Sequence, residues 1–200
     1  MIYSASMAIK VEAPTLSQKT ADSLQNAGFV VVTAEGLSIQ GQRDKGRKFW
    51  SRVHEGDQAF ERLNCEPSQF AYHPDQLILP NSVGKPLDET VAKMLDVKER
   101  QLRKGKQHIP GNFTVAMFAM QEVVGISYDS MKNGKPILGD VYTWTTTHHV
   151  ASVFDRGKWV NKEQVAVVGL PIPEWGPSVG LSLPHQASAR IGIAFKVVPL

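Results

Sequence analysis

The first third of the chain alternates between hydrophobic patterns typical of strands and patterns typical of helices. Residues 7–12 alternate apolar and polar side chains, as a half-buried strand does. Residues 15–18 form a capping box that starts a helix, and Gly28 supplies the left-handed stop that ends it. Residues 29–33 are apolar and indicate a buried strand. The pattern therefore predicts a β-α-β unit with a short crossover.

The middle of the chain predicts two helices separated by a loop. Residues 47–63 indicate a helix broken near Gly56, and the prolines in residues 64–85 favour a loop. Residues 86–104 give the clearest helix, with proline in its first turn, acidic side chains near its start and basic ones near its end. Gly105 is the expected terminator. Three pairs at i,i+4 spacing support this helix: Glu89–Lys93, Asp96–Arg100 and Glu99–Arg103.

From residue 112 onward the pattern favours strands. The apolar run 113–124 is interpreted as a strand, and Asn133-Gly134 is typical of a hairpin turn because both residues tolerate positive φ. A second turn is expected at residues 155–157, and a long loop rich in proline and glycine at residues 169–187. The other strands are expected at residues 141–153, 158–160, 165–168 and 191–197.

Together these elements predict an α+β fold. An N-terminal β-α-β unit and basic helices occupy about residues 1–110, and a largely antiparallel β half occupies about residues 111–200. No segment has the composition of a linker, so we expect residues 1–200 to form a single domain.

Composition narrows the class of protein. Hydrophobic residues make up 42% and charged residues 20% of the chain, which is ordinary for a globular domain and argues against disorder. The single cysteine, Cys65, cannot form an internal disulfide, so the fold must rest on packing, as in a reducing cytoplasmic setting. No apolar run is long enough to span a bilayer, and we expect no membrane partner. Nucleotide-binding and metal-binding motifs are absent from the sequence, so no cofactor and no metal ligand are assigned.

Basic residues gather in two short stretches, although the net charge is only +3. The first stretch holds Arg43, Lys45, Arg47, Lys48 and Arg52, interleaved with Phe49 and Trp50. The second holds Lys98, Arg100, Arg103, Lys104 and Lys106. Phosphates are bound by lysine and arginine, and single-stranded bases stack on aromatic rings.

The leading hypothesis is a non-enzymatic protein that contacts nucleic acid and could act as a subunit of a larger nucleoprotein complex with other protein subunits. The first stretch, with Trp50, would be the principal contact. Arg100, Arg103, Lys104 and Lys106 would be accessory if folding brings the two stretches to one face. The plainer interpretation is that Trp50 belongs to the core beside a solvated basic face. For the second stretch, the helix dipole alone favours cations at that end.

A second hypothesis is a structural or assembly subunit of viral or secretion type, which the threonine-rich strands and the proline-rich loop at residues 169–187 suggest. A third is a metal- or histidine-dependent enzyme that uses His148 or His149 with Asp140. Adjacent residues on a strand point to opposite faces, so the two histidines cannot jointly bind one metal without a bulge. Residues 176–180 match the G-x-S-x-G pattern of hydrolases, but prolines flank them where that motif needs a strand and a helix, so we reject this interpretation.

Overall fold

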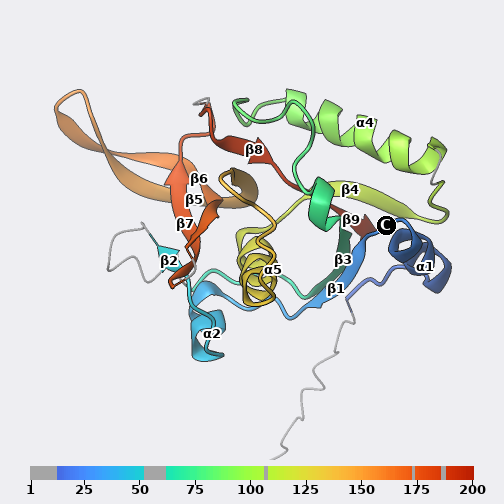
Figure 1. Cartoon of the computed structure of the whole chain (residues 1–200). Coiled ribbons are helices and arrows are strands. Elements are labelled where there is room, and N and C mark those ends of the chain that lie inside the picture. Colours follow the sequence, from blue (N-terminus) through green and yellow to red (C-terminus); the bar gives the residue numbers. More distant parts are fainter. Residues whose placement is uncertain (1–12, 52–61, 106–107, 173, 186–187) are drawn as a thin grey trace, which may run out of the picture.

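Two β-sheets that share one C-terminal segment form the frame of the protein (Figure 1). The computed structural model describes residues 13–51, 62–105, 108–172, 174–185 and 188–200. The first sheet is antiparallel and has the order β1 (Val30–Ala34), β3 (Ser68–Tyr72), β9 (Phe195–Pro199), β4 (Phe113–Met117). The second has the order β2 (Trp50–Ser51), β7 (Gly176–Ser182), β6 (Lys158–Ile172), β5 (Tyr142–Asp155), β8 (Ile191–Ile193). The predicted α+β class, with a largely antiparallel C-terminal half, is confirmed.

The C-terminal segment passes from one sheet to the other at Ala194. The strand predicted at residues 191–197 is therefore two strands, with β8 parallel to β5 and β9 between β3 and β4. Hydrogen bonds hold the crossing point, because the Thr143 hydroxyl accepts from the Ala194 amide at 2.7 Å and the Ile193 carbonyl accepts from the Leu79 amide at 2.8 Å. Periodicity alone does not reveal such a crossing, because both halves alternate in the same way.

Helix α1 (Gln18–Asn26) begins at a different cap from the one the sequence suggests. The Ser17 hydroxyl, and not that of Thr15, accepts a hydrogen bond from the Thr20 amide at 3.2 Å. The predicted stop at Gly28 is confirmed, since its φ of 87° lies in the left-handed region. The strand expected at residues 7–12 lies outside the described residues. Strand β1 after the helix pairs antiparallel with β3, and it is half exposed where a buried strand was predicted.

Helix α4 (Thr90–Lys104) starts later than predicted, because the Asp88 side chain bonds to the first residue of the helix. The Asp88 carboxylate accepts from the Thr90 amide at 2.8 Å and the Thr90 hydroxyl at 2.6 Å, which lowers the pKa of that carboxyl. Gly105 ends the helix as predicted. Two of the three expected pairs form, Asp96–Arg100 at 2.7 Å and Glu99–Arg103 at 3.0 Å. No helix among the described residues is long and apolar enough to cross a membrane.

The predicted strand at residues 113–124 divides into β4 and the start of helix α5 (Met120–Lys132). The first turn of α5 buries Met120, Val123 and Val124, so the apolar run serves a buried helix and not a longer strand. The hairpin expected at Asn133-Gly134 is wrong. Gly134 has a φ of 71°. This left-handed conformation suits a hairpin turn, but in this protein it follows the end of helix α5.

Two stretches predicted as loops contain strands. Residues 64–85 include β3 and a short 3-10 helix at Pro74–Gln76. Residues 169–187 include the end of β6 and the whole of β7, which is buried over most of its length. The helix predicted at residues 47–63 is also wrong in its described part, where the chain enters β2. In each case pairing with a strand distant in sequence overrides the local preference for a loop or helix.

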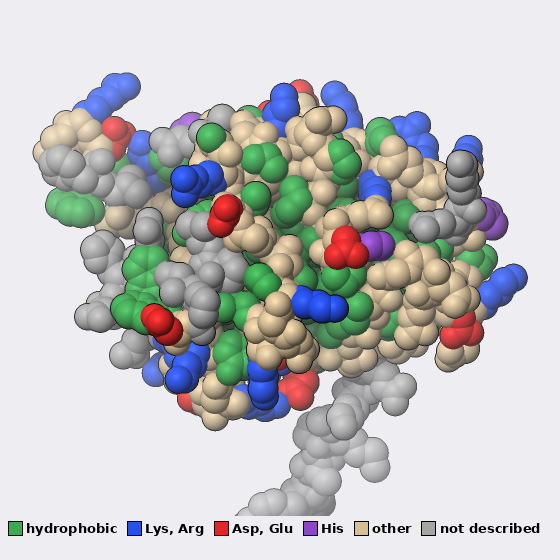
Figure 2. Space-filling view, viewed as in Figure 1, with side chains coloured by type: hydrophobic (Ala, Val, Ile, Leu, Met, Phe, Trp, Pro, Cys, Tyr) green, Lys and Arg blue, Asp and Glu red, His purple; other side chains and the backbone are tan. Residues whose placement is uncertain are grey.

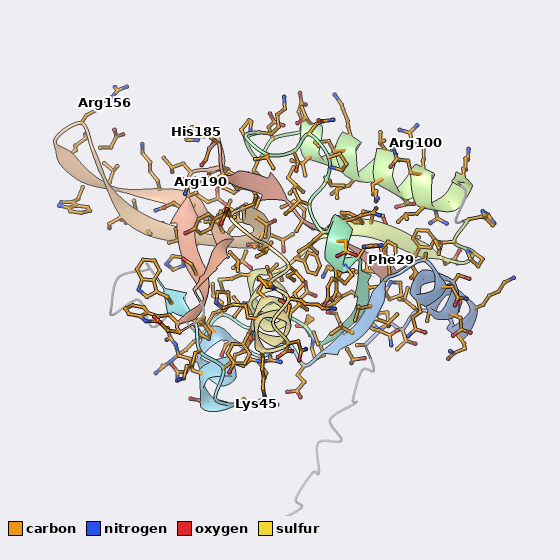
Figure 3. The ribbon with its side chains drawn as sticks, in the orientation of Figure 1. Phe29, Lys45, Arg100, Arg156, His185 and Arg190 are labelled. Atoms are coloured by element: carbon orange, nitrogen blue, oxygen red, sulfur yellow. The ribbon has the colours of Figure 1, made fainter. Side chains whose placement is uncertain are left out.

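The hairpin of β5 and β6 is predicted correctly and is the most extended feature of the molecule. Arg156 and Gly157 have φ of 48° and 85°, as a tight two-residue turn requires. The two short strands expected at residues 158–160 and 165–168 merge into one. The outer part of the hairpin extends beyond the other strands of the second sheet (Figure 1), and Figure 3 labels Arg156 at its tip.

A buried ion pair joins α5 to the first sheet. The Lys196 ammonium on β9 donates to both carboxylate oxygens of Glu122, at 2.6 and 2.5 Å, and their side chains are 11% and 3% exposed. The Ser68 hydroxyl and the Ala119 amide also donate to this carboxylate, at 2.7 and 2.8 Å. Every oxygen is thereby hydrogen-bonded, which is the condition for keeping charge in a core.

We expect Glu122→Gln to lower the free energy of unfolding by about 3–5 kcal/mol, because it leaves the Lys196 ammonium buried without its counter-charge. Urea unfolding followed by circular dichroism measures this. The double variant Glu122→Gln/Lys196→Met should recover most of the loss, since it removes the orphaned charge and places an apolar side chain against Phe70 and Phe118. Glu163→Gln, in the exposed pair with His148, serves as the control and should change stability by less than about 1 kcal/mol. A loss as small as that control's would contradict the assigned role of the pair.

Candidate functional site

The first basic stretch lies on the turn that joins α2 (Ile39–Asp44) to β2. The Ser38 hydroxyl caps the helix by accepting from the Gly41 amide at 3.0 Å, and Gly46, with φ of 82°, turns the chain outward. Trp50 then pairs in parallel with Ser178 of β7. Arg43 therefore lies in the last turn of α2, whereas Lys45, Arg47 and Lys48 lie on the turn that follows, next to the second sheet. Arg52 lies outside the described residues.

Three of these cations already contact other side chains. Lys45 forms an ion pair with Glu35, which holds the pKa of the Glu35 carboxyl below its usual range. Arg47 donates to Asp129 of α5 at 3.0 Å and to the Gln42 side-chain oxygen at 3.2 Å. The Arg43 guanidinium lies 4.5 Å from the centre of the Phe49 ring. These contacts reduce the positive charge that the stretch presents to a ligand.

Lys48 differs from its neighbours. Its side chain is exposed, and within the part of the chain that the structure describes it has no hydrogen bond or ion pair. It stands between two adjacent hollows and contributes to the wall of each. Of this stretch, Lys48 is therefore the cation best placed to meet an anionic ligand without first breaking an existing contact.

The first hollow is aromatic and cationic. It has a volume of about 380 Å³ and is lined by Arg43, Arg47, Lys48, Phe49, Trp50 and Trp175. Trp175 is 54% exposed, and its ring meets that of Trp50 edge to face, with the ring centres 6.5 Å apart and an angle of 67° between the planes. An exposed indole beside lysine and arginine offers a stacking surface and a positive charge at one place.

A glycine places Trp175 in this hollow. Gly176 has φ of 80°, and a Cβ atom there would collide with the Lys48 carbonyl. The absence of a side chain at Gly176 lets the start of β7 run directly against the Lys48–Phe49 backbone. Trp175 was expected in a loop, and its proximity to Trp50 depends on this contact between segments distant in sequence.

The second hollow adjoins the first across Lys48. It has a volume of about 630 Å³, and its lining includes Tyr128 and Lys132 of α5 together with Glu174. Lys132 is exposed and has no hydrogen bond or ion pair to any residue that the structure describes. The Tyr128 hydroxyl donates to the Gly46 carbonyl at 3.4 Å, which ties the wall of α5 to the basic turn. Glu174 supplies the opposite charge.

The second basic stretch lies elsewhere and is used differently. Arg103 pairs with Glu99, donates to the carbonyls of Gly111 and Phe113, and lies with its guanidinium 4.2 Å from the Phe113 ring centre. It therefore fastens α4 to the start of β4. Arg100 pairs with Asp96, and Lys104 is exposed on the last turn of the helix. Lys106 lies outside the described residues.

The structure does not bring the two basic stretches together. Figure 3 labels Lys45 below α2 at the lower edge of the molecule and Arg100 on α4 at the upper right. Figure 2 shows basic side chains along the upper edge over α4 and again at the lower left over α2, where acidic and hydrophobic side chains lie among them. The single shared face that would make the second stretch accessory is not formed.

The histidines considered for metal binding are on the β5–β6 hairpin. His148 pairs with Glu163 across the strands at 2.7 Å, and His149 stands opposite Gln164. An irregularity in the pairing lies between Trp144 and His148, so strict alternation of the two faces does not hold along this part of β5. Among the described residues no group of three or more histidine, cysteine, aspartate or glutamate side chains could hold a metal ion.

A third hollow, of about 330 Å³, lies between β1, α2 and α5 and is lined in part by Cys65, Gln121 and Glu122. Its buried polar side chains are satisfied within the protein, since Gln121 donates to the Leu63 carbonyl at 2.7 Å and Glu122 is bound by Lys196. Burial, followed by the nearby Glu122 carboxylate, raises the pKa of the Cys65 thiol to about 11. The thiol is therefore a poor nucleophile near neutral pH.

No family model, no curated protein and no solved structure matches this chain.

We expect Gly176→Ala to separate Trp175 from Trp50, because the added methyl group meets the Lys48 carbonyl at a backbone conformation that alanine disfavours. The variant should lose about 1–3 kcal/mol of stability, and its indole emission should shift to longer wavelength as the ring contact is lost. Gly134→Ala is the matched control, because Gly134 also has positive φ but has open space around it. An unchanged emission spectrum in Gly176→Ala would show that the glycine does not hold the pair.

We expect Cys65 to react slowly with iodoacetamide in the folded protein at about pH 8.5, where a free thiol is half ionised. A raised pKa keeps the thiol protonated, so the rate should increase with pH up to about 11. In urea the same reaction should level off near the ordinary thiol pKa of about 8.5. Because the chain has one cysteine, the mass increase reports this site alone. Equal pH profiles in folded and unfolded protein would be inconsistent with a shifted pKa.

Proposed function

We propose that this protein contacts nucleic acid through the aromatic and cationic hollow between α2, β2 and the start of β7. One observation carries the proposal: Lys48 and Trp175, both exposed, line the same hollow with Arg43 and Trp50. Lysine supplies the charge that binds phosphate, and an exposed indole supplies the face on which a base stacks. The hollow therefore offers both chemistries to one ligand.

The proposed surface is narrower than the one expected from the sequence. Lys45 and Arg47 are already in ion pairs with Glu35 and Asp129. They add to the local positive field, but a phosphate that binds either of them must compete with its carboxylate partner. The α4 stretch lies apart and its arginines are paired, so it is not included. The proposal therefore predicts a contact made with few phosphates, in which aromatic stacking supplies a large share of the affinity.

The assembly hypothesis stays a prediction. The feature that bears on it is the projecting β5–β6 hairpin, on which Val150 and Trp159 are 60% and 65% exposed. An exposed apolar hairpin is common at protein interfaces, but nothing in the described residues selects a partner for it.

We expect Lys48→Glu to weaken binding of a fluorescently labelled oligonucleotide by about tenfold or more, because it removes one phosphate contact and adds a repulsive charge. Fluorescence anisotropy at several salt concentrations measures this. The affinity of the unaltered protein should fall with salt, with a slope of about 0.7–0.9 for each phosphate contacted, and the slope should become smaller in the variant.

Arg100→Glu is the matched control, since it reverses a surface charge on α4 far from the hollow. It should change the affinity by less than about threefold, because exposed distant charges are screened. If both charge reversals weaken binding equally, the contact is general attraction to a basic protein. If the unaltered protein binds no oligonucleotide at low salt, the proposed function is wrong.

A further inference from the structure

We propose that the ligand is a single strand of nucleic acid that runs from the Trp50–Trp175 hollow, across Lys48, into the second hollow beside Lys132. This inference rests on the proposed function and names its substrate class and path. It distinguishes a single strand from a duplex, and it extends the contact to residues of α5 that the first hollow does not include.

The aromatic geometry favours an unpaired base. The edge-to-face contact with Trp50 holds one side of the Trp175 ring, while more than half of that residue stays exposed. Stacking on the remaining surface requires a base whose own face is open. In a duplex each base is covered above and below by its neighbours, whereas a single strand presents its bases freely.

The dimensions of the site favour the same ligand. The two hollows, of about 380 and 630 Å³, fall within the range of pockets that take small molecules, about 300–1,000 Å³. Each suits a nucleotide unit, and their shared wall at Lys48 suits the phosphate between two such units. Reading a duplex groove requires a protruding helix or ribbon. Beside the hollows α2 is a helix of only six residues, and the projecting β5–β6 hairpin lines neither hollow.

The charges define the path beyond the first hollow. Lys48 and Lys132 are both exposed and line the second hollow, and the described residues offer neither an ion pair. They form two successive positions for backbone phosphates. The Tyr128 ring of α5, which faces the basic turn, is a further aromatic surface in this hollow. Glu174 lies in the same hollow and opposes a phosphate there, so the balance of Lys132 and Glu174 sets how strongly this part binds.

The test compares oligo(dT) and oligo(U), each about 12 nucleotides long and so within the site size of single-strand-binding surfaces, with a blunt-ended duplex of about 12 base pairs. The unaltered protein should bind at least one of the two single strands more tightly than the duplex, and the comparison of the two strands separates DNA from RNA. Trp175→Ala should weaken binding of the preferred single strand by about tenfold to a hundredfold. Trp175→Phe should restore most of the affinity, because phenylalanine also stacks.

Trp159→Ala is the matched control, because Trp159 is similarly exposed but lies on the β5–β6 hairpin. It should leave single-strand binding unchanged. At saturating ligand, quenching of tryptophan emission should be smaller in Trp175→Ala, where Trp50 is the remaining indole of the hollow, and should be unchanged in Trp159→Ala.

Two variants of opposite sign test the path. Lys132→Glu should weaken binding of the strand by about tenfold, whereas Glu174→Gln should tighten it by a few-fold, since it removes a carboxylate from the hollow. Unchanged affinity in both would overturn the path through the second hollow.

Failure of this inference can be distinguished from failure of the proposed function. Salt-dependent binding that Lys48→Glu weakens, but that is as tight for the duplex and unaffected by Trp175→Ala, would overturn the single-strand inference and leave the nucleic-acid contact standing. Loss of duplex binding in Trp159→Ala would identify the hairpin as the reader and overturn the inference in the same way. Binding of none of the three oligonucleotides would overturn both.

Discussion

The buried ion pair between Lys196 and Glu122 is the constraint on which the arrangement of the site depends. A charge enclosed in a core must keep its partner, so the first turn of α5 is fixed against β9 of the first sheet. From that fixed start α5 runs to the surface beside α2, where it delivers Asp129 to Arg47 and the Tyr128 hydroxyl to the Gly46 carbonyl. The α5 wall of the second hollow, and through Asp129 the Arg47 side chain of the first, are therefore positioned by an interaction at the opposite end of the helix.

The distribution of charge at the surface explains why a count of cations overstates the positive charge that the site offers to a ligand. The first basic stretch has a strong excess of positive residues in sequence, but Glu35 and Asp129 arrive from other elements and pair with two of them. The surface that remains is a small number of exposed lysines around an indole pair. Such a surface binds an anion that also has an aromatic or planar face better than a simple polyanion, because charge alone gives weak attraction at physiological salt.

The sequence predicts the elements that local interactions determine. Asp96–Arg100 and Glu99–Arg103 lie within one helix, and the turn at Arg156-Gly157 depends on two adjacent residues, so both α4 and the β5–β6 hairpin could be expected. Strand β7 could not, because its prolines and glycines favour a loop until β6 and β2 pair with it. The site divides in the same way: the basic turn is visible in the sequence, whereas the approach of Trp175 and Lys132 depends on contacts between distant segments.

The two basic stretches show that composition does not determine the role of a cation. Arg103 and Lys48 belong to stretches of similar charge, yet Arg103 is held by a carboxylate, two carbonyls and an aromatic ring. In Lys48 it is the backbone that packs, against Gly176 of β7, while the side chain is exposed. Removing Arg103 would expose unsatisfied groups at the junction of α4 and β4, and the cost would appear in stability. Removing the Lys48 side chain breaks no hydrogen bond or ion pair among the described residues, so we expect its cost to appear mainly in what the surface binds. A charged residue whose loss would leave the fold intact is where selection for binding, as opposed to folding, is expected to act.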